Sequence, residues 1–302
     1  MKNPKVSVII PTFNREKLII RSINSLLNQT NQDYEIIIAD DASTDNTAEV
    51  IKSLKNDKIR YFRLEKNSGQ CVTRNKAIKI AKGEYIGFLD SDDEWLPEKI
   101  EKQLAVFETS IDPDLGAVYC GFIEKDEIKN QTSIINRDNL KGNIYGSLLR
   151  GFCPSTPTMF LVKKKALEKV NGFDENLPTF VDYDLWLRIA KEGFTFDYVN
   201  EPLIVKYEHA GAQIAKDPSK RKKGLELFLE KWGHEILKNA GKKGYNRFRR
   251  NKIEVLVKSV LENPGENYRK NMIKSIGLLY QARSWKIKFY LKAIVIYALG
   301  EL

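Results

Sequence analysis

The sequence has few cysteines and no long apolar run, and each shortage excludes a class of protein. Its three cysteines, Cys71, Cys120 and Cys153, lie far apart and form no CxxC or Cys/His spacing, so neither a disulfide framework nor a structural zinc site is predicted. No run reaches the roughly 18 apolar residues of a membrane-spanning helix, and the five-residue run at 6–10, VSVII, is too short for a secretory signal. These absences favour a reducing, cytoplasmic setting.

Glycine-rich phosphate loops are also absent. The first apolar run, VSVII, continues into PTFNRE without a GxGxxG or GxxxxGK[ST] pattern, which argues against a dinucleotide oxidoreductase and a P-loop NTPase. The formal net charge is +10, but residues 1–218 carry a net charge of −3 and residues 219–302 a net charge of +13. The 302 residues therefore predict a near-neutral body of about 200 residues and a basic tail.

Short β-branched runs alternate with segments of helical periodicity over the first 95 residues. The predicted strands are VSVII, YEIIIAD, IRYFRL and EYIGFL, with helices between them. This alternation is typical of an α/β fold with a mostly parallel, Rossmann-like sheet flanked by helices. Ligands bind such sheets beyond the carboxyl ends of the strands. That rule selects four loops: PTFN, DDASTD, EKNSGQ and DSDDEW.

The loop at 90–95 concentrates acidic side chains, Asp90, Asp92, Asp93 and Glu94, directly after an apolar strand. Carboxylates held together repel one another unless a cation or a set of hydrogen-bond donors lies between them. A Mg²⁺ or Mn²⁺ that also binds substrate phosphates would satisfy them. The alternative is a solvated turn with acidic residues at the start of a helix. In either case Glu94 and Trp95 are expected to be helix-start and packing residues.

Five ordered segments resemble the family-2 glycosyltransferases, inverting enzymes of GT-A fold that use a nucleotide-sugar donor. The segments are VSVIIPTFNRE, IIIADDASTDNT, NSGQCVTRNKAI, GEYIGFLDSDDEWLP and VDYDLWLRIA. The resemblance covers residues 4 to about 210. It implies a GT-A catalytic domain at 1–218, with a nucleotide-binding half at 1–95 and an acceptor-side half at 96–218, followed by a basic helical C-terminal region at 219–302.

The resemblance also assigns donor and metal residues. Pro11 and Phe13 would line the base pocket, Asp41 would contact the base and Arg74 would lie near the nucleotide. Asp90, Ser91 and Asp92 match the DxD motif, in which Asp90 would reach the ribose side and Asp92 would coordinate Mn²⁺ or Mg²⁺ on the diphosphate. The further metal-ligand candidates are Asp93 and His209. The sequence does not rank Asp93 against Asp92, and His209 could equally be structural.

Asp182 matches the catalytic base of the family, although Val181 stands where the family usually has an acidic residue. Inversion needs one carboxylate that takes a proton from the acceptor hydroxyl opposite the leaving diphosphate. Without the resemblance, Asp182 could simply be a helix N-cap. Asp184 and Arg188, spaced i,i+4, are expected to form a supporting pair. The stretch at 125–143 is polar and is expected to be irregular.

The basic tail has three readings: contact with anionic lipid, a helical cap on the catalytic domain, or nucleic-acid binding, which no recognition motif supports. The sequence thus predicts transfer of a sugar, from a UDP-linked donor, to a saccharide or lipid-linked acceptor in surface polysaccharide or glycoconjugate assembly. Peripheral contact with the inner face of the cell membrane is part of that expectation. The alternatives are a metal-dependent sugar nucleotidyltransferase and a non-catalytic sugar-nucleotide or membrane-binding module.

Overall fold

The computed structural model describes residues 3–135, 139–154, 156–208 and 217–262, together with positions 273, 277 and 280. The chain divides into two compact units. Unit 1 comprises Met1–Leu148, Phe152–Glu175 and Asp182–Ala210. Unit 2 comprises Leu149–Gly151, Asn176–Val181 and Gly211–Leu302.

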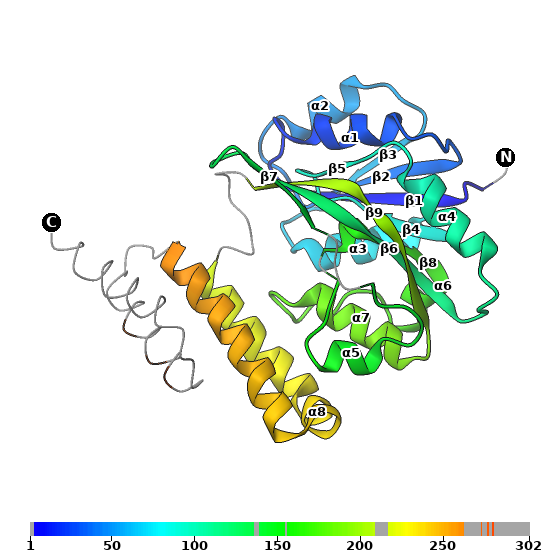
Figure 1. Cartoon of the computed structure of the whole chain (residues 1–302). Coiled ribbons are helices and arrows are strands. Elements are labelled where there is room, and N and C mark those ends of the chain that lie inside the picture. The colour runs from blue at the N-terminus through cyan, green and yellow to red at the C-terminus, as the bar shows by residue number, and fades with distance from the viewer. Residues whose placement is uncertain are drawn as a thin grey trace, which may run out of the picture. The chain divides into compact units, whose positions relative to one another are not determined.

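Unit 1 begins with a parallel half-sheet in the strand order β3-β2-β1-β4. Its elements are β1 (Val6–Thr12), α1 (Ile19–Leu27), β2 (Tyr34–Asp40), α2 (Thr47–Ser53), β3 (Ile59–Arg63), α3 (Gln70–Ile80) and β4 (Tyr85–Phe88). Helices α1 and α2 lie on one side of these strands and α3 on the other (Figure 1). Because both faces are covered, β2 is buried along its whole length. The predicted alternation of strands and helices is confirmed.

Beyond β4 the sheet becomes mixed. Strand β8 pairs antiparallel with β4, and the order continues β8-β6-β9-β5. The remaining elements of this part are β5 (Glu94–Trp95), α4 (Lys99–Thr109), β6 (Leu115–Asp126), β7 (Gln131–Ile135), α5 (Tyr145–Leu149), the 3₁₀ turn η1 (Pro157–Met159), β8 (Leu161–Lys163), α6 (Lys164–Lys169), α7 (Val181–Lys191) and β9 (Thr195–Glu208). The long parallel pairing of β6 with β9 extends the half-sheet that carries the DSDDEW loop.

Two local expectations were wrong. Glu94 does not start a helix; with Trp95 it forms β5, which pairs antiparallel with β9 through Glu94 with Val205 and Trp95 with Ile204. Trp95 is a packing residue as expected, since it is only 2% exposed. The Trp95 indole lies where a side chain on Gly87 of β4 would be, since a Cβ there would come within 3.0 Å of the ring. The stretch at 125–143 is not wholly irregular either, because β7 pairs antiparallel with the end of β6.

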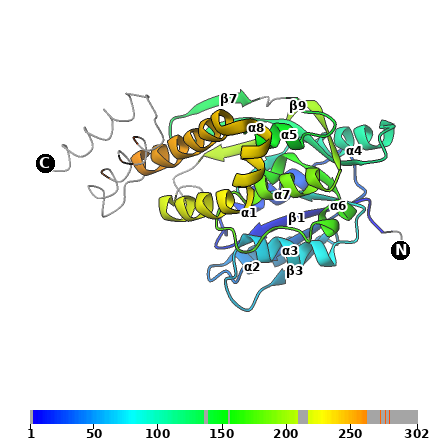
Figure 2. The same ribbon diagram turned by 90° about the horizontal axis from the view of Figure 1, so that it is seen from below.

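Unit 2 is built on α8 (Pro218–Glu262), which changes direction at Gly241, where φ is +65°. Figure 2 shows its two arms lying side by side. Phe228 and Phe248 stack between the arms with ring centroids 6.1 Å apart, so the turn brings apolar faces of both arms together. In the described part of the chain, no helix combines the length and the apolar character needed to cross a membrane.

Candidate active site

The site lies at the carboxyl edge of the parallel strands. β1 ends at Thr12, β2 at Asp40 and β4 at Phe88, and all three run in the same direction. Their following loops therefore emerge at one edge, which is where open α/β sheets bind ligands. The loop after β4 carries the acidic cluster predicted from the sequence.

Arg74 and Asp90 form an ion pair at the centre of this edge. Arg74, on α3, is only 3% exposed, and its Nη2 lies 2.6 Å from Asp90 Oδ1. Burial alone would lower the pKa of Arg74, but the charges of Asp90 and Asp182 together raise it. Thr156 Oγ1 donates to the other Asp90 oxygen over 3.2 Å. Asp90 is thereby fixed by groups from two distant segments of the chain.

Asp182, in the first turn of α7, shares this charge environment. Burial raises the pKa of its carboxyl from 3.8 to about 7, Arg74 opposes that rise and Asp90 adds to it. Its Oδ1 is buried, and none of the described residues forms a hydrogen bond with it. A carboxyl group with a pKa near neutrality and an oxygen not engaged in a described hydrogen bond is suited to accept a proton from a substrate.

Asp93 is buried in the acidic loop, at 2% exposure. Its Oδ1 accepts the backbone N–H of Tyr207 over 3.2 Å, while its Oδ2 is buried and has no hydrogen-bond partner in the part of the chain that the structure describes. Burial, Asp90 and Asp92 all raise the pKa of Asp93 well above its usual value, and Lys206 lowers it. A buried carboxylate whose pKa is raised by neighbouring carboxylates favours a bound cation.

The described residues hold no group of three or more His, Cys, Asp or Glu side chains arranged to enclose a metal ion. The donor set still fits Mg²⁺ or Mn²⁺, because these ions are commonly held by one or two carboxylates and completed by water and substrate phosphates. The unpaired Oδ2 of Asp93 supports that fit. The loop can therefore supply part of a coordination shell, with a diphosphate supplying the rest.

Residues 7–170 match the family model described as glycosyl transferase family 2. This chain belongs to that family. The matched range includes the PTFNRE, DDASTD and DSDDEW loops at the edge described above. The family assignment predicted from the five segments is confirmed.

Curated relatives agree with the family assignment. The chain is 36% identical over 212 residues to the uncharacterized glycosyltransferase MJ1057 of Methanocaldococcus jannaschii, covering 68% of this chain and 71% of the relative. It is 32% identical over 245 residues to the Escherichia coli glucosyltransferase WfaP, covering 80% of this chain and 89% of that protein. By contrast, it spans only 27% of the length of an uncharacterized glycosyltransferase of Rickettsia bellii, at 38% identity over 63% of this chain.

Solved structures confirm the GT-A fold. S. aureus TarS 1–349, solved in complex with UDP-GlcNAc, superposes with a TM-score of 0.61 at 20% identity and covers 98% of this chain and 92% of that chain. The mannosyltransferase PcManGT from Pyrobaculum calidifontis, solved with GDP-Man and Mn²⁺, gives 0.60 at 17% identity, over 100% of this chain and 89% of that chain. At these identities the likeness establishes the architecture alone.

The residues that the resemblance predicts to bind the donor differ in how deeply they are buried. Phe13 is 39% exposed and Pro11 is half-buried, beside the end of β1. Asp41 is buried, and its two oxygens accept the backbone N–H groups of Ser68 over 2.7 Å and Gly69 over 2.8 Å. Asp41 thus holds the NSGQ loop in place, in addition to any contact with a base.

Other predicted residues fall around this group. Ser91 is buried within the acidic loop, and the Asp92 carbonyl accepts a hydrogen bond from Arg21. The pair Asp184 with Arg188 is confirmed, at 2.7 Å. His209 lies outside the described residues.

The sequence reading missed several groups that touch the acidic loop. Thr158 Oγ1 accepts from the Asp90 backbone N–H over 3.3 Å, and Ser22 Oγ donates to the Asp93 carbonyl over 2.7 Å. Arg21 is a third. Only a weak signal marks them: Thr158 opens an apolar run, and Arg21 and Ser22 interrupt an apolar helix face. Their partners lie too far along the chain for spacing to reveal the contact.

Proposed function

We propose that this chain is an inverting, metal-dependent glycosyltransferase that moves a sugar from a UDP-linked donor to a saccharide or lipid-linked acceptor. The observation that carries the proposal is Asp182, a carboxyl with a pKa of about 7 beside the Arg74–Asp90 pair. A general base works best when its pKa lies near the working pH. The acidic loop on the same edge provides the phosphate side of the site.

In the proposed reaction, Asp182 takes the proton of the acceptor hydroxyl as that oxygen attacks the anomeric carbon of the donor. The bond from this carbon to the diphosphate breaks, and the sugar is transferred with inversion. Arg74 keeps Asp90 oriented and offsets part of the negative charge of the leaving group. A divalent ion bound through Asp92, with Asp93 as a second candidate ligand, would neutralise the diphosphate as a Lewis acid.

The donor and acceptor classes are supported by relatives. WfaP is named a UDP-Glc:alpha-D-GlcNAc-diphosphoundecaprenol beta-1,3-glucosyltransferase, and a Bacillus subtilis protein 33% identical over 210 residues is named a putative teichuronic acid biosynthesis glycosyltransferase. The first name specifies a UDP-linked donor and a lipid-diphosphate-linked acceptor, and the second specifies a role in teichuronic acid biosynthesis. We place this chain in the same class of pathway.

The proposal is tested by nucleotide release from a panel of UDP- and GDP-sugars with Mn²⁺ or Mg²⁺, in the presence of lipid-diphosphate-linked saccharide acceptors. We expect one UDP-sugar to be turned over, with activity lost on EDTA treatment and in Asp92→Ala. Activity that survives both treatments would exclude the metal assignment. If none of the nucleotide sugars in the panel is turned over, the proposed transferase activity is contradicted.

We further propose that α8 makes peripheral contact with anionic lipid on the inner face of the cell membrane. Lys242 and Lys243 are exposed near its turn, and each such charge contributes about 1 kcal/mol at an anionic surface. Co-sedimentation with phosphatidylglycerol vesicles should weaken in the double variant Lys242→Gln, Lys243→Gln. The matched control replaces two exposed α3 lysines, Lys76→Gln and Lys79→Gln. Equal losses in both pairs would contradict a specific role for α8.

A further inference from the structure

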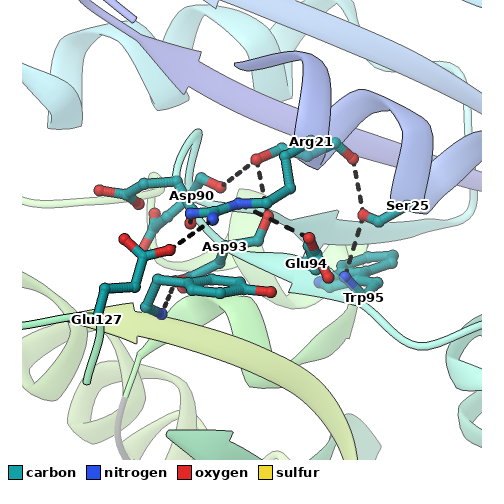
Figure 3. A network of polar contacts seen from close by, with 10 residues as sticks. Arg21, Ser25, Asp90, Asp93, Glu94, Trp95 and Glu127 are labelled. Carbon is teal, nitrogen blue, oxygen red and sulfur yellow. Dashed lines mark hydrogen bonds and ion pairs between the residues drawn. The ribbon is translucent and has the colours of Figure 1, made fainter. Parts of the chain in front are cut away.

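Arg21 projects from α1 toward the acidic loop and meets groups from three other segments (Figure 3). Its Nη2 donates to the backbone carbonyl of Asp92 over 2.8 Å. Its Nη1 lies 3.0 Å from Glu127 Oε1, and its Nε lies 3.7 Å from Glu94 Oε1. The guanidinium carbon stands 3.5 Å from the centroid of the Tyr207 ring. One side chain thus joins α1, the acidic loop and the ends of β6 and β9.

The neighbours of Arg21 on α1 bind the same loop. Ser22 Oγ donates to the carbonyl of Asp93 over 2.7 Å, and its distance to the carbonyl of Asp90 is 3.3 Å. Ser25 Oγ accepts the backbone N–H of Trp95 over 3.1 Å. Position 25 lies four residues after position 21 and three after position 22, and these spacings put side chains on the same side of adjacent helical turns. α1 therefore fixes the loop backbone from Asp90 to Trp95.

Tyr207 closes this arrangement from the other side. The Arg21 guanidinium makes a cation–π contact with its ring, and its backbone N–H donates to Asp93 Oδ1 over 3.2 Å. Arg21 and Tyr207 therefore hold neighbouring residues of the loop, Asp92 by its carbonyl and Asp93 by its side chain. A guanidinium suits this role, since its planar fork can donate in several directions while its face stacks on an aromatic ring.

An ordinary ion pair does not explain the arrangement. The side chain of Glu127 is 43% exposed, and exposed ion pairs contribute little to stability. The contacts to the Asp92 carbonyl and the Tyr207 ring lie on the side of Arg21 that faces the acidic loop. These contacts bear on where the Asp92 side chain points, because a carbonyl held in place also fixes the peptide that carries that side chain.

We propose that Arg21 is a positioning residue for the metal–diphosphate part of the site. It sets the backbone of Asp92 so that the loop carboxylates can meet a divalent ion carried by the nucleotide, and it contacts neither the ion nor the nucleotide. This inference rests on the metal role of the acidic loop in the proposed function. Residues that orient metal ligands typically change metal affinity about 10- to 100-fold when they are replaced.

The test measures UDP and GDP binding by calorimetry to the full chain, with and without Mn²⁺. In Arg21→Met we expect nucleotide affinity in Mn²⁺ to fall about tenfold, while metal-free affinity stays at the wild-type value. Arg21→Lys keeps the charge but cannot span the same acceptors, so its loss should resemble that of Arg21→Met. Glu127→Gln loosens Arg21 without removing it and should give a smaller loss in the same direction.

The matched control is Arg60→Met. Arg60 also forms an ion pair, 2.6 Å from Glu35, but Glu35 lies near the start of β2, at the opposite edge of the sheet. We expect it to leave both affinities unchanged. Because Glu127→Gln leaves the contacts of Arg21 with the Asp92 carbonyl and the Tyr207 ring in place, it keeps the test usable if Arg21→Met folds poorly.

Two outcomes overturn the inference, and they are distinguishable. If wild type shows Mn²⁺-enhanced binding and the Arg21 and Glu127 variants retain it in full, Arg21 does not position the loop although the metal assignment stands. If Mn²⁺ changes the affinity of the wild-type protein for neither UDP nor GDP, the metal assignment itself fails and the role of Arg21 fails with it.

Discussion

The pH dependence of turnover should report Asp182. Because burial raises the pKa of this carboxyl to about 7, the group is protonated below neutrality and cannot accept the acceptor's proton. One pH unit below its pKa, only about a tenth of the enzyme carries the ionised base, so kcat/KM should fall about tenfold per unit on the acid side. Above pH 7 the rate should level off.

The assay is nucleotide release at subsaturating donor from about pH 5.5 to about pH 8.5, where kcat/KM reports groups of the free enzyme. Asp182→Asn keeps the size of the side chain but removes the base. It should lower kcat/KM about 10²- to 10⁴-fold and abolish the acid limb, while calorimetric binding of UDP with Mn²⁺ is retained. An unchanged acid limb in Asp182→Asn would refute the assignment of Asp182 as the base.

The positive charges of Arg74 and Lys206 provide a second test of the Asp182 pKa. Arg74 lowers the Asp182 pKa more than Lys206 does. Removing either charge should move the acid limb to higher pH, with a larger displacement in Arg74→Met than in Lys206→Met. We expect Arg74→Met to weaken donor binding as well, so the two variants are compared by the midpoint of the acid limb, which depends on protonation. A limb that moves to lower pH in either variant would contradict the electrostatic argument.

Two further predictions concern stability. Gly172 has a φ of +67°, and a Cβ there would come within 3.0 Å of Asn75 Oδ1, whereas Gly193 has a φ of +90° and a Cβ there would meet no described atom within 4 Å. The backbone cost of about 1 kcal/mol is common to both positions, so Gly172→Ala should lower the thermal midpoint of unfolding more than Gly193→Ala. Equal midpoints would show that the Asn75 contact contributes nothing. Lys99 is fully buried, and burial lowers its pKa to about 8. As the pH rises, the folded state therefore loses this proton before the unfolded state does, so the free energy of unfolding, measured in urea, should rise between about pH 8 and pH 10 relative to that of Lys99→Met. Parallel pH profiles of the two proteins would contradict that shift.

The half of the fold that the sequence predicts well is the half built from local signals. The parallel strands from Val6 to Phe88 are short apolar runs separated by helical patterns, and each connection is a local βα unit. The second half depends on pairings that no local pattern encodes. The sequence predicts Glu94 as a helix start because acidic residues favour helix N-termini, yet the pairing of Glu94 and Trp95 with β9 and the space left by Gly87 decide their conformation.

The candidate site divides along the same line. Asp90, Asp92 and Asp93 are visible as an acidic loop after a strand, and the family resemblance adds Asp182. What the sequence could not provide is the environment of these residues. The pKa of Asp182 depends on Arg74 and Asp90, which lie about a hundred residues away along the chain, and the burial of Asp93 depends on Tyr207 at the end of β9. These are tertiary effects of packing and charge.

Placing so many carboxylates in one loop requires that the backbone be held firmly, because mutual repulsion would otherwise open it. The structure meets this need from two sides. α1 binds the loop carbonyls through Arg21 and Ser22, and β9 binds it through the Tyr207 N–H and the pairing with β5. Repulsion among the carboxylates then remains available to favour a cation, since the chain cannot relieve it by moving. The two-residue strand β5 is therefore as much a part of the proposed metal site as the aspartates that precede it.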